Sequence, residues 1–357
     1  MQKRKKALAV VAGPYRLLQV LWLTLKYKEY DWSVVLLRYG EDLSVVENLK
    51  KACINSGVFE NVYTAITVSR YSSYAAKIRE TLKMFFYYLI GKRKTYCLKL
   101  ITNYISNFDY QLLCVAGSYS FFEGAVLNFS SDIETLIIQE GLPDYIKTTT
   151  NYNKITDLAS NFLYKMGYIN LKANPDFGFY NTCTKYAALP DKLRYKGFKK
   201  TEYMFDNSLI DKNTFRTLIQ KFFPVEAETY DAVLFTAPLQ LYSKNDFSEL
   251  IQWLEKNYKN KRILIKKHPQ DTADYYCENV KIFNKYTEFP GEVLLQCVSK
   301  CRLYFLFPSN MLIDIVRNPE VDYYVIHFTG LDAAYEKNFK RAVEFLEISS
   351  QKIIELK

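Results

Sequence analysis

The sequence predicts an α/β protein made of two doubly wound domains, each built on a parallel sheet. Short apolar runs alternate with segments of helical spacing, and this alternation occurs twice along the chain. A length of 357 residues also suits two domains better than a single core. We therefore predict an N-terminal domain over 1–225 and a C-terminal domain over 226–357, with a closing helix at 333–349 that can cross back to the first domain.

The first domain is predicted to begin with a strand, a tight turn and a helix. An apolar run at 7–12 precedes Gly13-Pro14-Tyr15, and the apolar side chains of 16–25 have helical spacing. Further apolar runs predict strands at 32–37, 61–68, 110–116 and 134–139. Helical spacing predicts helices at 43–56, 157–166 and 212–222, and it continues through the aromatic, basic segment 72–108.

The second domain repeats the alternation of strands and helices. Strands are predicted at 231–235, 263–265, 280–283, 303–307 and 322–328. Helices are predicted at 246–257, at 291–301, after Pro308-Ser309-Asn310 and at 333–349.

Composition restricts the classes of protein that this chain can belong to. The net charge of +10 predicts an anionic partner, which is a nucleic acid, a phosphorylated substrate or an anionic membrane surface. The seven cysteines form no CxxC pair and predict a reduced, cytoplasmic chain. No run reaches the roughly 18–20 apolar residues of a membrane span. The sequence lacks GxGxxG, P-loop, GxSxG and HExxH motifs, and two histidines are too few for a histidine-rich metal centre.

One of the two histidines follows a predicted strand directly. Lys266, Lys267 and His268 come where the strand ends, and Pro269 favours an extended backbone at His268 and stops the ladder. The imidazole is therefore expected at the carboxyl edge of the sheet, where open α/β sheets bind ligands. It is interpreted either as a phosphate ligand and proton donor or as part of an ordinary strand-terminating turn.

Two further segments belong to the same predicted edge. Ser309 suits a helix N-cap, and free amides at a helix N-terminus bind anions, although an ordinary cap explains the serine equally well. Glu292 precedes a helix, where it is interpreted as a ligand of ribose hydroxyls or as a partner of the helix dipole.

Two carboxylates are candidates for a general base. Glu140 follows a predicted strand and precedes Gly141, and Asp246 begins a predicted helix after a loop. Each also has a purely structural interpretation, as a surface acid or as a helix cap. Asp246 is slightly preferred as the base, but the sequence does not decide between the two.

Taken together, these motifs resemble those of bacterial sialyltransferases, in particular the lipooligosaccharide sialyltransferase group known as glycosyltransferase family 52. That family has an acidic-acidic-glycine motif, an HP motif and a Ser/Thr-Ser motif in this order. The same order holds here for Gln139-Glu140-Gly141, His268-Pro269 and Ser309-Asn310. The first strand–turn–helix and the segment 289–292 also resemble the family. Gln139 replaces the first acid of the family motif, and Asn310 replaces the second hydroxyl residue.

The resemblance implies a GT-B-type fold with two Rossmann-like domains facing a central cleft, CMP-sialic acid as donor, inversion at the anomeric carbon, and no metal or cofactor. It implies that cations and dipoles stabilise the departing phosphate, that Glu292 binds the cytidine ribose, and that Glu140 or Asp246 deprotonates a galactose-type hydroxyl. The expected donor-binding residues are Lys266, Lys267, Pro269, Glu292, Pro308, Ser309, Asn310, Gly13 and Tyr15, with His268 as the catalytic histidine.

The expected partners are a nucleotide-sugar donor, a glycan acceptor of a lipooligosaccharide or capsule, and a second copy of the chain in a homodimer. The basic, aromatic segment 83–99 predicts either peripheral contact with the anionic inner face of the membrane or a partly buried helix with solvated lysines. Two other hypotheses remain: a transferase of another CMP- or UDP-activated sugar, and a basic nucleic-acid-binding protein. The absence of RNP-like, KH and zinc motifs argues against nucleic acid as a partner.

Overall fold

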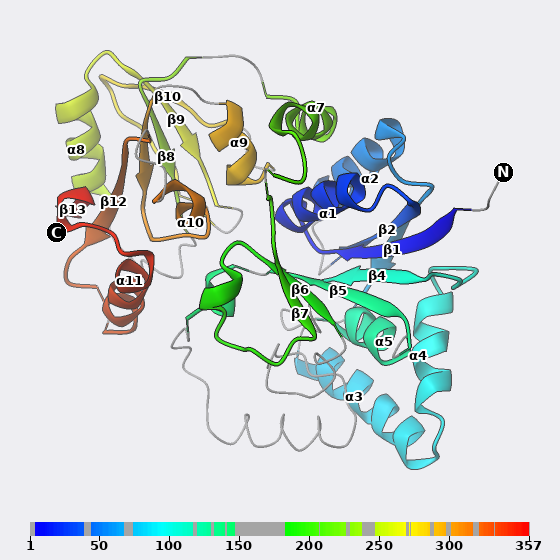
Figure 1. Cartoon of the computed structure of the whole chain (residues 1–357). Coiled ribbons are helices and arrows are strands. Elements are labelled where there is room, and N and C mark those ends of the chain that lie inside the picture. The colour runs from blue at the N-terminus through cyan, green and yellow to red at the C-terminus, as the bar shows by residue number, and fades with distance from the viewer. Residues whose placement is uncertain are drawn as a thin grey trace. The chain divides into compact units, whose positions relative to one another are not determined.

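The computed structural model divides the chain into two compact units (Figure 1). Unit 1 comprises Met1–Glu140 and Asn151–Phe222, and unit 2 comprises Gly141–Thr150 and Phe223–Lys357. The residues that the structure describes are 4–38, 44–67, 74–116, 120–129, 132–139, 141–146, 183–206, 208–225, 229–237, 247–268, 271, 273–285, 289–297, 301–316, 321–331 and 333–356. The segment 141–150, expected in the first domain, thus belongs to unit 2.

Unit 1 is built on a seven-stranded sheet in the order β3-β2-β1-β4-β5-β6-β7, in which every described pairing is parallel. Its strands are β1 (Lys5–Val11), β2 (Tyr30–Arg38), β3 (Asn61–Ile66), β4 (Leu112–Val115), β5 (Glu134–Ile138), β6 (Thr184–Ala187) and β7 (Lys200–Tyr203). Its helices are α1 (Pro14–Lys26), α2 (Ser44–Ser56), α3 (Tyr74–Leu89), α4 (Arg93–Thr102), α5 (Phe121–Phe129) and α7 (Lys212–Phe222).

Helices cover both faces of this sheet, which makes the central strands apolar along their whole length. Helices α1, α2 and α7 lie on one face, and α4 and α5 lie on the other (Figure 1). Strand β1 is buried from Ala7 to Val11 as a result. Helix α1 follows it after Gly13, which has a φ of 91° and needs the conformational freedom of glycine.

Unit 2 is built on a six-stranded parallel sheet in the order β10-β9-β8-β11-β12-β13. Its strands are β8 (Ala232–Phe235), β9 (Arg262–Lys266), β10 (Lys281–Phe283), β11 (Arg302–Phe305), β12 (Tyr323–Phe328) and β13 (Ile353–Leu356). Its helices are α8 (Ser248–Tyr258), α9 (Gly291–Cys297), α10 (Leu312–Ile315) and α11 (Ala333–Leu346). Helices α8 and α9 lie on opposite sides of the sheet (Figure 1).

The strand order of each unit reverses once, which is the feature that places ligand sites in open parallel sheets. The chain winds outward in one direction from β1 to β3 and then returns to β4 on the other side of β1. In unit 2 the same reversal lies between β8 and β11, whose ends are joined by the stacked rings of Phe235 and Phe305 (centroids 4.9 Å apart). The prediction of an α/β chain with two Rossmann-like sheets is confirmed, and such a pair of sheets forms the building blocks of a GT-B fold.

Candidate functional site

The main chain of His268 is held by a closed ring of hydrogen bonds. Its N–H donates to Thr236 Oγ1 (2.8 Å), and its carbonyl accepts from the Asp271 N–H (2.8 Å). Thr236 is hydrogen-bonded to the Tyr275 hydroxyl, which in turn donates to Asp271 Oδ2 (2.9 Å). Thr236, Asp271 and Tyr275 are all buried. Strands β8 and β9 therefore fix the backbone of His268 at the carboxyl edge of the unit 2 sheet.

The environment of the His268 side chain disfavours its charged form. The pKa of the imidazole is lowered to about 4, chiefly by burial and also by the positive charge of Lys266, while the Asp271 carboxylate acts in the opposite direction. The imidazole is consequently neutral at pH 7 in the free protein, and one of its ring nitrogens carries a hydrogen that can be donated.

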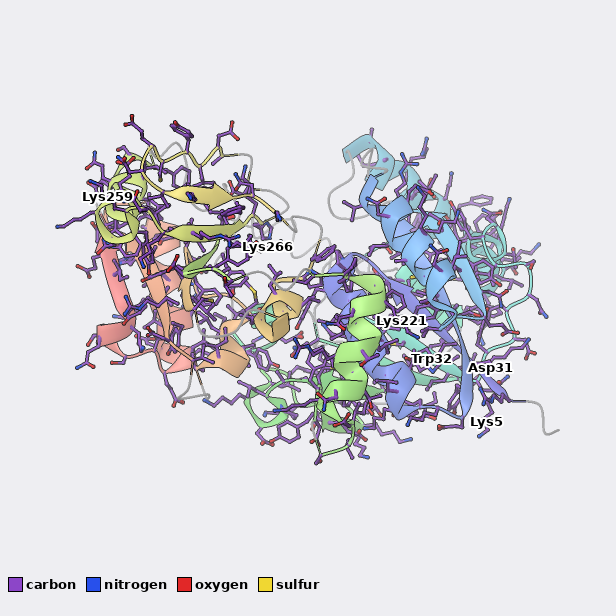
Figure 2. All side chains as sticks on the ribbon, turned by 90° about the horizontal axis from the view of Figure 1, so that it is seen from above. Lys5, Asp31, Trp32, Lys221, Lys259 and Lys266 are labelled. Carbon is purple, nitrogen blue, oxygen red and sulfur yellow. The ribbon has the colours of Figure 1, made fainter. Side chains whose placement is uncertain are left out.

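Lys266, the last residue of β9, is a buried cation at the same edge. Its Nζ donates to the carbonyl oxygen of Lys267 (2.8 Å). Burial lowers the pKa of its ammonium to about 8, and the carboxylate of Glu292 opposes that shift. Figure 2 shows Lys266 at the opposite end of β9 from Lys259, which precedes the strand. Glu292, in the first turn of α9, is thus close enough to act on the charge of Lys266.

Lys267 has different partners from Lys266, because successive residues of an extended chain point to opposite faces. Its Nζ lies 3.7 Å from Asp274 Oδ1 and 5.7 Å from the centroid of the Tyr275 ring. The two lysines were expected to act together on one phosphate. The structure instead pairs Lys266 with Glu292 and Lys267 with the segment that follows His268.

Ser309 follows β11, which is separated from β9 only by β8, so that the two strands are about 10 Å apart. The prediction that Ser309 caps a helix is wrong. Helix α10 begins at Leu312, has Met311 at its N-cap and is only four residues long. The Ser309 carbonyl accepts the Leu312 N–H (3.1 Å), while its Oγ is buried and has no hydrogen-bond partner among the described residues. A buried hydroxyl in this state is available to a ligand.

Two of the three motifs that the sequence singled out meet in unit 2. Asn310 Oδ1 accepts a hydrogen bond from the Leu142 N–H, and the Asn310 side chain lies against Gly141. A Cβ on residue 141 would collide with that side chain. Gly141 also has a φ of 133°, which other residues rarely adopt. The asparagine that replaces the second hydroxyl of the motif therefore anchors the chain directly after Glu140.

The first residue of the acidic motif has a structural role in unit 1. Gln139 is buried; its Nε2 donates to the Tyr15 hydroxyl (2.8 Å), and its Oε1 accepts the Ala188 N–H (2.8 Å). Its carbonyl oxygen accepts from Gln19 Nε2 of α1 (3.1 Å). This network ties the end of β5 to α1, which begins after Gly13 at the carboxyl edge of β1.

Three of the expected site residues, Glu140, Asp246 and Pro269, lie outside the described residues, and both candidate bases are among them. Helix α8, expected to begin at Asp246, begins at Ser248. Pro308 is buried between β11 and Ser309.

Sequence reasoning missed Thr236, Asp271 and Tyr275 as functional residues. They belong to two loops that meet only after folding, and no spacing in the sequence links them. A polar residue at the end of a central parallel strand, such as Thr236 after β8, is the signal that could have drawn attention to one of them.

The site offers cations and hydrogen-bond donors for an anion. In the described parts of the chain no group of three or more His, Cys, Asp or Glu side chains could hold a metal ion. Within the same described ranges, no helix is both long and apolar enough to cross a membrane.

A family model described as alpha-2,8-polysialyltransferase (POLYST) matches residues 7–301. No curated protein matches the chain at a significant level.

Solved structures resemble the chain along nearly all of its length. The glycotransferase of kitacinnamycin is 9% identical, with 99% of this chain and 87% of that chain covered and a TM-score of 0.49. The glycosyltransferase SnogD from Streptomyces nogalater is 13% identical over 99% and 87% of the two chains, with a TM-score of 0.45. UGT89C1 from Arabidopsis thaliana, solved with UDP-L-rhamnose, is 8% identical over 96% and 83%, with a TM-score of 0.47. At these identities and TM-scores, the similarities carry no functional argument.

Proposed function

The chain belongs to the alpha-2,8-polysialyltransferase family and is a glycosyltransferase, and on that basis we propose that it moves sialic acid from CMP-sialic acid to a hydroxyl of a cell-surface glycan. We propose further that the reaction inverts the anomeric carbon and needs neither a metal nor a cofactor. The observation that carries this proposal is the buried ammonium of Lys266, which lies at the carboxyl edge of a parallel sheet together with His268 and the unpartnered Ser309 hydroxyl.

The departing group requires positive charge more than it requires a proton. Breaking the bond between the anomeric carbon and the phosphate oxygen leaves CMP with nearly two negative charges at pH 7, because the second pKa of a phosphate monoester is about 6. Lys266 supplies a fixed positive charge in a site of low polarity, where it acts strongly. His268, neutral in the free protein, donates a hydrogen bond to a phosphate oxygen, and the Ser309 hydroxyl donates another.

The rest of the site completes the reaction. Glu292 binds the cytidine ribose, and its negative charge helps to keep the Lys266 ammonium protonated before the donor enters. A carboxylate, Glu140 or Asp246, accepts the proton of the acceptor hydroxyl while its oxygen forms the new bond on the opposite face of the sugar. Gly13, Tyr15, Lys267, Pro269, Pro308 and Asn310 are proposed to line or to shape the donor site.

The acceptor is proposed from the family and from the motif order. The description of the family points to a terminal sialic acid, whereas the resemblance to glycosyltransferase family 52 points to a galactose-type hydroxyl of a lipooligosaccharide or capsule. We propose that the enzyme acts on the cytoplasmic side of a membrane. A homodimer remains a prediction.

The test is an incubation with CMP-sialic acid and two acceptors, one ending in galactose and one in sialic acid, with products identified by mass. We expect product formation that EDTA does not inhibit. His268→Ala should reduce turnover by about 10²–10³-fold without a change in melting temperature. His327→Ala, at the only other histidine of the chain, is the matched control and should retain near-normal turnover of the folded protein.

Binding of nucleotides separates this proposal from its nearest rival. CMP should raise the melting temperature and UDP should not. Stabilisation by UDP alone would instead support a transferase of a UDP-activated sugar. Full activity of His268→Ala would remove the imidazole from the mechanism.

A further inference from the structure

Helix α3 (Tyr74–Leu89) exposes a row of large apolar side chains. Leu82, Phe86 and Leu89 are each 61% exposed, Ile78 is 42% exposed and Phe85 is 36% exposed. These five residues, which we call the α3 stripe, follow the spacing of a single helix face. Soluble proteins rarely leave such a continuous apolar row in water, and exposed patches of this kind mark interaction surfaces.

The orientation of the stripe is fixed by the opposite face of the helix. Glu80 accepts a hydrogen bond from the Tyr96 hydroxyl of α4 (3.0 Å), and the Tyr87 ring packs on that of Tyr96 (centroids 4.9 Å apart). Tyr96 belongs to the buried core of unit 1. Because Glu80 and Tyr87 are seven residues apart, they share a face, and the α3 stripe lies roughly on the far side of the helix from them. Packing against α4 therefore turns the apolar residues outward.

Basic residues surround the stripe. Residues 74–102 contain seven Lys and Arg and a single acid, Glu80, a net charge of +6 out of +10 for the whole chain. Arg79 and Lys83 lie between the stripe and Glu80; their side chains are 69% and 51% exposed, and both pair with the Glu80 carboxylate (3.4 and 2.8 Å). Lys92 and Lys94 are exposed just beyond the end of the helix.

This distribution of charge selects the kind of partner. A second copy of the chain would bring a surface of net charge +6 against an equal one, and repulsion would oppose that contact. An anionic bilayer offers negative headgroups for the lysines and arginines and an apolar interior for the stripe. With 16 residues, α3 is about 24 Å long, so it suits lying along a membrane rather than crossing it.

We infer that the α3 stripe is a docking surface for an anionic membrane. Helix α3 lies parallel to the bilayer with the stripe among the acyl chains, and the ammonium and guanidinium groups beside it reach the headgroups. Only the purpose that we give to this docking, which is to bring the enzyme to lipid-linked acceptors, rests on the proposed function. Of the two sequence-based hypotheses for the segment 83–99, it favours membrane contact over a partly buried helix.

The test measures binding to vesicles without any donor or acceptor. Full-length protein is sedimented with vesicles of phosphatidylcholine alone or with 30% phosphatidylglycerol. We expect binding to the anionic vesicles that weakens as salt is added. Leu82→Gln/Leu89→Gln should lower the partition coefficient at least about tenfold. The control variant Ile54→Gln/Leu209→Gln changes two other aliphatic side chains, each 56% exposed and outside α3, and should bind like the wild type.

Charge is tested by a separate variant. Lys92→Glu/Lys94→Glu should lose the preference for anionic vesicles while keeping its melting temperature. Equal binding by the stripe variant and the wild type would overturn the inference, and so would equal binding to neutral and anionic vesicles. A wild-type dimer in light scattering that the stripe variant abolishes would assign the surface to a second copy of the chain. Turnover of a soluble acceptor, measured apart, reports on the proposed function alone.

Discussion

Replacing Lys266 by methionine should make the free protein more stable and abolish its binding of CMP. The side chain is only 6% exposed, and burial lowers the pKa of its ammonium from 10.5 to about 8. At about 1.4 kcal/mol per pKa unit, keeping this charge inside the folded protein costs about 3 kcal/mol at pH 7. The variant also loses the hydrogen bond to the Lys267 carbonyl, which reduces the stabilisation by about 1 kcal/mol. The expected net stabilisation is about 2 kcal/mol.

The dependence on pH follows from the direction of the shift. The folded-state pKa of Lys266 is lower than its unfolded value, so the cost is fully present below about pH 8, where both states bind the proton. Between pH 8 and 10.5 the folded state releases the proton first, and the wild type gains stability. The advantage of the variant should therefore shrink as the pH rises through this window.

Thermal unfolding with and without CMP measures both effects. At roughly 2–4 °C per kcal/mol, the variant should unfold about 4–8 °C higher than the wild type at pH 7. CMP should raise the melting temperature of the wild type and leave that of the variant unchanged. Lys259→Met, at the C-terminal end of α8 and at the opposite end of β9 from Lys266 (Figure 2), is the matched control and should keep its response to CMP. A less stable Lys266→Met protein, or one that CMP still stabilises, would refute this account of the site.

Three other substitutions test the surroundings of the site by thermal unfolding and turnover. Gly141→Ala should lower the free energy of unfolding by roughly 2–3 kcal/mol. Adding Asn310→Ala should recover only part of this loss, because the clash disappears while the strained φ of 133° remains. Full recovery would show that the backbone is not strained. Gln139→Glu restores the acid of the motif but buries a charge, so the variant should lose stability at pH 8 and regain it on acidification, as the raised carboxyl pKa is crossed. Loss of stability that does not depend on pH would contradict that. Thr236→Val removes the acceptor of the His268 N–H and should lower turnover more than substrate affinity; unchanged turnover would show that the ring of hydrogen bonds does not position the histidine.

The elements that sequence reasoning found are those whose pattern is set by local physics. Strand β1 and helix α1 were predicted because a buried apolar run, a glycine turn and helical spacing follow one another. Helix α5 was missed because nearly all of its described side chains are buried, so its apolar run has no helical period. Strand β7 was missed because it lies at the edge of the sheet with mostly exposed, polar side chains. Strands β6 and β13 are only four residues long.

The site was predictable where it depends on the ends of strands. Lys266 ends a buried strand and His268 follows it, and the topology places both at the carboxyl edge of the sheet. Ser309 was assigned to the right edge for a wrong reason, since the chain makes a turn before the helix that it was expected to cap. The ring through Thr236, Asp271 and Tyr275 requires the chain after His268 to fold back, which no local pattern encodes.

The segment 141–150 has a consequence for how this chain can be divided. Leu142 and Tyr145 are buried, and the Tyr145 ring stacks on Phe345 of α11 (centroids 5.4 Å apart), so that unit 2 borrows part of its interior from the first half of the sequence. A protein cut after Phe222 would leave the C-terminal fragment with an uncovered apolar surface where Leu142 and Tyr145 pack. Exchanging unit 2 between relatives therefore requires a crossover on each side of the segment 141–150, in addition to the one at Phe222.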